Sequence, residues 1–588
     1  MTALIAILLL LFTPAVMLFI RTLWPNSRFL WLAALFGTLL AWVAVFIARY
    51  DLPFEIAPQT WQPAAFFPLS PALLVDTTAW IFALTLATHA VAIMLTGTAR
   101  LGGWGVHEPI VPIAGENEAP SPVSKPSAEN QEDAPALQVA GENEPLSPAA
   151  SQPPPLPANW KAWAANLALT SLGLVAVLAG NLLTLLLAWS ALDILELLIL
   201  LGQVSSSEQR GQVVRTYGAR CGGTIMLLLA GLFIWAGGGE LDFNQSAASV
   251  NLLLFIAASL RLGILPLQVP FFGEPPLRIG LGTTLRLVPA AASLVLMVRT
   301  AQAGLPGTVG LLILAFAALA GLAGSIGWLR AETALSGRPY WLIATASLVL
   351  AAAVQGPPAA SLAWSLALLL PGSLIFLSSL RARFLAPVLL LGLLGLSGLP
   401  FTPLWAGSRM FQAPAGLEWV AGQIMAMLFM LILFIVHAIL LAGYLRHSLP
   451  GMLVADGGPQ LKVERWVWLL YLPGLVILPV FHFILGWMLK PEPTQVSLVM
   501  WLQGACALGL AGAIWLSTSR PRSPKFTFLA GRGWLSSGKI YRPLYQPVEW
   551  LFRLAARIVR VSSAVLEGEA GILWAFVLLV FGLLFLQQ

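Results

Sequence analysis

Two carboxylates, Asp193 and Glu196, lie three residues apart inside a long apolar run. The run extends from Asn181 to Leu201, which is long enough to cross a bilayer as a helix. At this spacing the two acids share one helix face with Ser190. Because an ionised carboxylate is costly inside a membrane, acids at such positions are candidates for function. We therefore interpret this polar stripe as a candidate proton relay.

The same two acids have a simpler interpretation. They can pair with arginines on neighbouring helices and serve only to fix the packing of those helices. This alternative predicts that neutralising both acids leaves transport unchanged.

Arginines form the next group of candidates. Arg261 lies inside the apolar run from Val250 to Leu267, and Pro266 must break or kink that helix because proline lacks a backbone donor. Broken helices in transporters often make ion sites, although a kink alone is common. Further along, Arg286 and Arg330 lie in or near apolar sequence. A guanidinium stays protonated, so these arginines can tune the acids but cannot carry the proton themselves.

Histidines add a weaker signal. His437 and His482 each lie within an apolar run, where an imidazole can titrate near neutral pH or simply form a packing hydrogen bond. We keep His437 as a candidate for the proton pathway. Asp76, just before the apolar segment that follows it, is expected to begin a helix at the membrane interface.

Several classes of chemistry are excluded. Only two cysteines occur, Cys221 and Cys506, and the sequence contains no CxxC motif or Cys/His cluster. Glycine-rich nucleotide loops and the GxSxG motif are also missing. We expect no bound cofactor or metal, no catalytic site within this chain and no nucleic-acid partner.

Composition sets the fold class. Hydrophobic residues make up 58% of the 588 residues and charged residues 10%, values typical of a polytopic membrane protein. Counting apolar stretches predicts an all-α protein with about 14 to 16 transmembrane helices. The first, near residues 3–20, is expected to be retained, because no cleavage site follows it.

Basic residues predict the orientation. Three basic regions fall on one side of the membrane in this count: the loop with Arg21 and Arg28, a loop with Arg210, Arg215 and Arg220, and the stretch from Arg520 to Arg560. The positive-inside rule places them inside and the N-terminus outside. We expect the protein in a bacterial inner membrane.

Two segments differ from the rest. Residues 113–157 are rich in proline and acids and are expected to be disordered. Residues 546–561 carry arginines on one side of a helical wheel and apolar residues on the other, so we expect a helix lying on the membrane surface, in contact with phospholipids.

Several stretches resemble one protein family. The run NLLTLLLAWSALDILELLILL is similar to the fifth span of the antiporter-like membrane subunits of respiratory complex I, Mrp antiporters and membrane-bound hydrogenases, and the long L-type subunit fits best. LLVDTTAWIFAL, SLRLGILPLQVPF, GTTLRLVPAAASLVLMVRT, GWLRAETALSGRPYWLIATASLVLAAAVQG and LLGLSGLPFTPLWAG match further family segments in order and spacing. Together they cover most of residues 70–405.

The resemblance implies an architecture and a function. The family has two inverted five-helix repeats with broken helices and a charged axis, and it is driven by a redox module. The implied partners are other membrane subunits and protons or sodium ions, as in an NADH:quinone oxidoreductase-like translocase. The expected division is 1–100 N-terminal helices, 101–160 disordered loop, 161–300 first repeat, 301–450 degenerate second repeat, 451–518 additional helices, 519–568 basic loop with the surface helix, and 569–588 C-terminal helix.

The resemblance also assigns the candidate residues, with departures. Arg261 and Arg330 stand where the family has lysines, Arg286 where it has a histidine, Gly372 where it has the lysine of the second broken helix, and Ser190 where it has a glutamate. These changes remove titratable groups or fix a charge, so the second half-channel is expected to be broken. Asp193 and Glu196 are expected to replace the missing glutamate.

Two rival functions stay open. The chain can be a structural paralogue that supports a membrane arm without conducting ions. It can also be a stand-alone cation/proton antiporter or the membrane half of an inorganic-carbon uptake pair. The proteins that co-purify with the chain would distinguish between these functions.

Overall fold

The structure is a computed structural model. It describes residues 2–24, 30–57, 70–97, 160–204, 207–238, 241, 243, 248–265, 279–305, 307–356, 358–378, 385–411, 420–449, 465–489 and 496–519. Three expected features lie outside the described residues: the 113–157 linker, the surface helix at 546–561 and the last span at 571–586.

Helices dominate the described residues. The elements in chain order are α1 (Thr2–Leu23), α2 (Leu30–Ile47), η1 (Ala48–Asp51), β1 (Phe54–Ile56), β2 (Leu73–Val75), α3 (Thr77–Gly97), α4 (Trp160–Val177), α5 (Leu182–Leu201), α6 (Ser207–Ala236), α7 (Ala248–Leu262), α8 (Ile279–Thr300), α9 (Gly307–Arg330), α10 (Arg338–Val354), α11 (Pro358–Leu377), α12 (Ala386–Gly395), α13 (Trp405–Ser408), η4 (Arg409–Phe411), α14 (Val420–Ser448), α16 (Arg465–Met488) and α17 (Leu498–Ser519).

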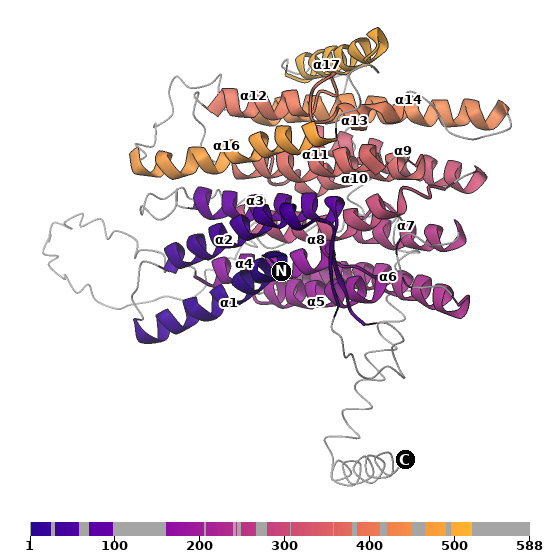
Figure 1. Cartoon of the computed structure of the whole chain (residues 1–588). Coiled ribbons are helices and arrows are strands. Elements are labelled where there is room, and N and C mark those ends of the chain that lie inside the picture. The colour runs from indigo at the N-terminus through magenta and orange to yellow at the C-terminus, as the bar shows by residue number, and fades with distance from the viewer. Residues whose placement is uncertain are drawn as a thin grey trace, which may run out of the picture.

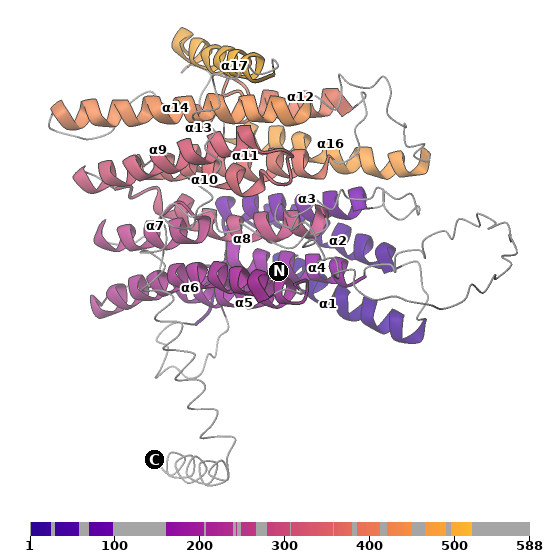
Figure 2. The same cartoon turned by 180° about the vertical axis from the view of Figure 1, so that it is seen from behind.

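The long helices lie side by side in one elongated bundle (Figures 1 and 2). From one end of the bundle to the other, α5 packs on α6, α6 on α7, α7 on α8, α8 on α10 and α11, and α14 on α17. The carboxylate-bearing helix α5 therefore lies at one end of the row, and α14 lies near the other.

The expected membrane class is confirmed. Within the described residues, eleven helices are long and apolar enough to cross a membrane, and three shorter apolar helices accompany them. The chain is thus an all-α polytopic membrane protein, with one short antiparallel ribbon formed by β1 and β2. The two inverted repeats stay a prediction.

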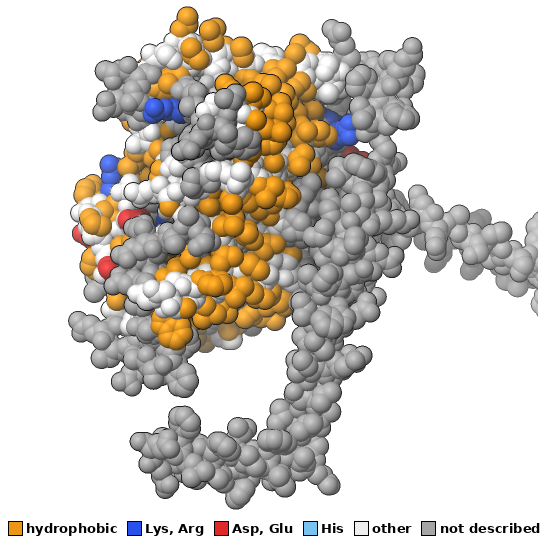
Figure 3. All heavy atoms as spheres, turned by 90° about the vertical axis from the view of Figure 1, so that its right-hand side faces the viewer, with side chains coloured by type: hydrophobic (Ala, Val, Ile, Leu, Met, Phe, Trp, Pro, Cys, Tyr) orange, Lys and Arg blue, Asp and Glu red, His pale blue; other side chains and the backbone are white. Residues whose placement is uncertain are grey.

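Burial separates inner from outer helices. The apolar windows of α8 and α11 are buried along their whole length, whereas most of the windows of α1 and α17 face outward. Figure 3, which looks roughly along the helices, shows hydrophobic side chains over much of the drawn surface and charged groups mainly near its edges. The apolar outer faces suit a lipid environment or neighbouring subunits.

Helix α5 is fixed at both ends. The side chain of Asn181 caps its start by accepting a hydrogen bond from the Thr184 backbone N–H at 2.9 Å, and Gly202 follows its last turn. Its buried residues recur every three or four positions and include Trp189, Asp193 and Glu196. The predicted inward polar stripe is confirmed for both acids, whereas Ser190 is half-buried and donates only to the Leu186 carbonyl.

Asp76 begins α3 as expected. Its carboxylate accepts a hydrogen bond from the Ala79 backbone N–H at 2.6 Å, the pattern of a helix N-cap. Arg299, at the end of α8, approaches the same carboxylate at 3.8 Å and donates to the Ala179 carbonyl at 2.6 Å. This contact ties the β ribbon region to the bundle.

Helix α7 ends earlier than expected. The predicted apolar run reaches Leu267, but the helix stops at Leu262 and Gly263 follows with φ of +75°. Glycine adopts this left-handed conformation without steric cost, so the helix ends before Pro266 is reached. Arg261 is therefore in the last turn of α7, next to the break.

The expected inner loop around Arg220 is wrong. Helix α6 begins at Ser207, so Arg210, Arg215 and Arg220 all lie within a helix, and Arg220 is buried. Polar residues and glycines lower the hydropathy of this stretch, which made it resemble a loop. Its arginine belongs to the interior of the protein instead.

An aromatic cluster fills the part of the bundle that contains Gly372. The cluster consists of Trp328, Trp341, Phe376 and Tyr444, from four different helices. The Trp341 indole donates to the Leu368 carbonyl at 3.1 Å and lies where a Cβ on Gly372 would be, 2.7 Å away. No side chain fits at position 372 unless Trp341 moves.

Gly372→Ala is therefore expected to destabilise the protein by about 1–2 kcal/mol, because the added methyl overpacks a dense core. The measurement is the unfolding midpoint of the purified chain in detergent, followed by tryptophan fluorescence. Gly509→Ala in α17 is the matched control, since nothing lies within 4 Å of its added Cβ. Equal midpoints for the two variants would show that the Trp341 indole can move aside without a loss of stability.

Candidate functional site: a buried cluster of carboxylates and guanidiniums

Asp193 and Arg261 form a buried two-pronged ion pair. The two guanidinium nitrogens of Arg261 meet the two Asp193 oxygens at 2.5 and 2.7 Å. Arg261 also donates to the Thr224 hydroxyl at 3.1 Å and lies over the Trp189 ring, 4.3 Å from its centroid. Both oxygens of Asp193 are thus occupied, and the guanidinium is held between a carboxylate and an aromatic face.

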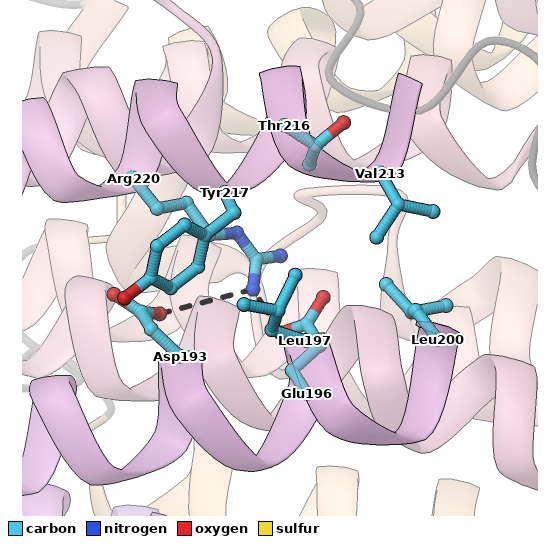
Figure 4. Close-up of a pocket in the computed structure, with 8 residues that line it drawn as sticks. All are labelled: Asp193, Glu196, Leu197, Leu200, Val213, Thr216, Tyr217 and Arg220. Atoms are coloured by element: carbon cyan, nitrogen blue, oxygen red, sulfur yellow. Dashed lines mark hydrogen bonds and ion pairs between the residues drawn. The ribbon is translucent and has the colours of Figure 1, made fainter. Parts of the chain in front are cut away.

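Glu196 pairs with a different arginine. Its Oε2 accepts a hydrogen bond from Arg220 of α6, and the same Arg220 nitrogen lies 4.0 Å from Asp193. Figure 4 shows the two α5 acids and Arg220 turned toward one another across the α5–α6 contact. Arg220 therefore lies within reach of both carboxylates.

A small cavity adjoins this pair. Asp193, Glu196 and Arg220 line it together with Leu197, Leu200, Val213, Thr216 and Tyr217. Its space is enough for about one water molecule. Glu196 is 3% exposed, and among the described residues its Oε1 has no hydrogen-bond partner.

An unpaired buried carboxylate oxygen needs an explanation. Leaving such a group without a partner costs free energy, by about 1–3 kcal/mol or more for a charged group. The cavity that this side chain lines offers one, since it has room for about one water molecule beside the carboxyl group. The site therefore combines a fixed pair, Asp193–Arg261, with a second carboxylate, Glu196, one of whose oxygens has no hydrogen-bond partner among the described residues.

Arg286 extends the cluster into the next helix layer. It is 4% exposed in α8 and interacts electrostatically with Glu196, Arg220 and Arg338. Arg338, in the first turn of α10, lies over the Phe376 ring of the aromatic cluster, 5.9 Å from its centroid. A series of charged groups thus leads from α5 through α8 to the edge of the aromatic cluster.

Solved structures with the same arrangement of helices are found in membrane complexes. A chain of the Mrp complex from Dietzia sp. DQ12-45-1b matches with a TM-score of 0.63 and 14% identity, over 99% of this chain and 62% of that chain. A chain of respiratory complex I from Thermus thermophilus matches with a TM-score of 0.53 and 15% identity, over 82% of this chain and 98% of that chain.

A third match is a chain of the membrane-bound sulfane sulfur reductase, an archaeal respiratory membrane complex, with a TM-score of 0.56, 13% identity and 99% of both chains covered. The chain has the fold of these membrane-complex subunits. It spans 62% of the Mrp chain's length. No protein-family model and no curated protein matches the sequence.

This fold agrees with the resemblance deduced from the sequence segments. The structure brings four of the candidate residues together: Arg261 contacts Asp193, and Asp193 and Arg286 lie within electrostatic range of Glu196. Arg330 is not among them, because it lies exposed at the end of α9.

His437 also lies apart from the cluster. It is buried in α14, where its Nε2 donates to the Leu396 carbonyl at 2.8 Å and its ring packs against Trp364. This geometry favours the packing interpretation of His437. His482 in α16 is buried too, and among the described residues neither of its ring nitrogens has a hydrogen-bond partner.

Gly372 is not in a broken helix. It lies inside α11, which runs without interruption from Pro358 to Leu377. The irregular segment of the second half follows α12, where Gly398 and Phe401 have positive φ angles. Arg409, which the sequence reading did not single out, is exposed just after this segment.

Sequence reasoning missed the residue that holds Glu196. Arg220 was assigned to a loop, and Thr224 and Tyr217 were not considered. One signal was available: Arg220 is followed directly by the apolar stretch from Cys221 to Ala236, which is continuous with a helix. Only the packing of α6 on α5 shows that its side chain enters the membrane interior.

Proposed function

We propose that this chain is a membrane subunit of a multi-subunit, complex I-like or related redox-driven assembly, and that it contributes to moving protons or sodium ions. The observation that carries the proposal is Glu196, a buried carboxylate that lines a small cavity, has one oxygen without a hydrogen-bond partner among the described residues, and interacts with Arg220 and Arg286 inside apolar helices. Buried ionisable groups in membrane helices generally mark ion pathways. The shared fold supports the same role.

In this proposal two residues of the site keep their charge and a third changes it. Asp193 and Arg261 form the fixed pair, since each satisfies the other and a guanidinium does not release its proton. Glu196 is the group whose charge changes. Arg220, within reach of both acids, is placed to follow that change by moving toward Asp193 when Glu196 no longer attracts it. Arg286 in α8 interacts electrostatically with Glu196, so a change in the charge of Glu196 also changes this interaction.

A non-conducting structural subunit is the second candidate. The observation that favours it is the aromatic cluster, in which Trp341 fills the space beside Gly372. In this reading the aromatic cluster ends the series of charged groups that leads from α5 through α8 to Arg338. In this case the ion pairs serve only packing.

The test begins by purifying the chain gently from its native membrane with its partners, which mass spectrometry identifies. Redox subunits in a fixed ratio are expected. The assembly is then reconstituted into vesicles, and ions moved per electron transferred are measured for wild type and for the Asp193→Asn/Glu196→Gln double variant. We expect the double variant to lose the part of the translocation that this chain contributes, while electron transfer continues.

The matched control carries the same chemical changes at exposed acids, Asp51→Asn and Glu55→Gln. An unchanged ion-to-electron ratio in the Asp193/Glu196 variant would favour the structural role. A chain that purifies alone would favour an independent transporter. The proposal includes a bacterial inner-membrane location with the N-terminus outside, in contact with phospholipids.

A further inference from the structure

We infer that the ion bound at this site is a proton and not sodium, and that Glu196, rather than Asp193, binds it. The inference rests on the proposed function and makes it more specific.

Both oxygens of Asp193 already accept hydrogen bonds from a guanidinium. Its Oδ1 and Oδ2 both accept hydrogen bonds from Arg261, and Arg220 lies 4.0 Å from Oδ1. A two-pronged guanidinium–carboxylate pair of this kind is among the stronger polar contacts in proteins. A cation bound at Asp193 would compete with Arg261 for the charge of the carboxylate.

Glu196 offers one oxygen. Its Oε2 is held by Arg220, whereas Oε1 has no hydrogen-bond partner among the described residues and belongs to a side chain that lines the cavity. A proton needs only one lone pair, because it forms a covalent O–H bond. The single open oxygen is sufficient for it.

Sodium has a larger requirement. A metal cation that leaves water must replace its hydration shell with several oxygen ligands. The cavity has room for about one water molecule, and Leu197, Leu200 and Val213 supply part of its wall. Besides the two acids, only the Thr216 and Tyr217 side chains in the lining carry oxygen. One available carboxylate oxygen and two hydroxyls do not make a sodium shell.

The binding step is balanced without any other reactant. A hydronium ion in the cavity gives its proton to Glu196 Oε1, so one O–H bond breaks in the hydronium, one forms on the carboxyl, and a water molecule remains. The neutral carboxyl attracts Arg220 less strongly, and Asp193 is the neighbouring acceptor. Release of the proton to water reverses each step.

The experiment is infrared difference spectroscopy of the purified full chain in lipid nanodiscs. Lowering the pH is expected to produce, besides the bands of exposed carboxyls, a separate carbonyl band at the higher frequency of a buried protonated carboxylic acid, and this band shifts in D₂O. The band should be missing in Glu196→Gln, present in Asp193→Asn and displaced in frequency in Glu196→Asp. The Asp variant retains a readable signal if the Gln variant does not fold. Replacing potassium by sodium at constant pH is expected to leave the spectrum unchanged.

Three results would overturn the inference. They are a protonated band that persists in Glu196→Gln, the lack of any such band over the pH range in which the chain is folded, and a sodium-induced change in the wild type that Glu196→Gln abolishes. These outcomes are separate from failure of the proposed function. A Glu196 band together with an unchanged ion-to-electron ratio would contradict the translocation role alone.

Discussion

Arg261→Met is expected to destabilise the protein by about 3–5 kcal/mol, because it leaves the carboxylate of Asp193 buried without its partner. Asp193 is 4% exposed, and Arg261 occupies both of its oxygens. The double variant Asp193→Leu/Arg261→Met is expected to recover most of this loss, since apolar residues of similar size often replace a buried ion pair at little cost. Unfolding midpoints of the wild type, both single variants and the double variant complete the cycle.

The double variant also separates stability from transport. It should fold, but it lacks the acceptor toward which Arg220 turns when Glu196 is neutral, so ion movement in the reconstituted assembly is expected to fall. Full ion movement in this variant would support the interpretation in which the acids only fix helix packing. A single Arg261→Met variant as stable as the wild type would mean that Asp193 is already neutral or reaches water.

The sequence was sufficient for features that depend on local periodicity. The length of the apolar runs predicted the membrane class, and the three-residue spacing predicted that Asp193 and Glu196 share the inner face of α5. Pairing of the acids with arginines on neighbouring helices was the alternative expected from the sequence, and Arg261 pairs with Asp193 in this way. The spacing of residues along the sequence is enough for these predictions, because helix geometry fixes which residues lie on one face.

The sequence was insufficient where rotation and packing of separate helices decide. Nothing in the order of residues states that Arg220 on α6 holds Glu196, or that Arg286 reaches the same site while Arg330 lies exposed at a helix end. The position of Gly372 was misjudged for the same reason. Its segment was expected to break, yet α11 continues through it, and the unwound segment follows α12.

The pairing of the acids depends on a close approach of α6 to α7, and Gly223 makes that approach possible. A Cβ at Gly223 would lie 2.7 Å from the Ala257 carbonyl oxygen and 2.6 Å from Cγ of Arg261. Because one of these atoms belongs to the backbone, the helices themselves must separate to admit a methyl group. Arg261 would then be displaced from Asp193 although every charged residue is still present.

Gly223→Ala is therefore expected to cost about 2–3 kcal/mol through overpacking and to reduce ion movement sharply. The neighbouring variant Gly222→Ala is the control, since nothing lies within 4 Å of its added Cβ and alanine favours the helix. Unfolding midpoints and ions moved per electron are measured for both. If Gly223→Ala lowered stability but left the ion-to-electron ratio intact, the position of Arg261 would not matter for transport. If both quantities fall together while Gly222→Ala leaves them unchanged, the geometry of the Asp193–Arg261 pair, and not merely its charge, is what the site requires.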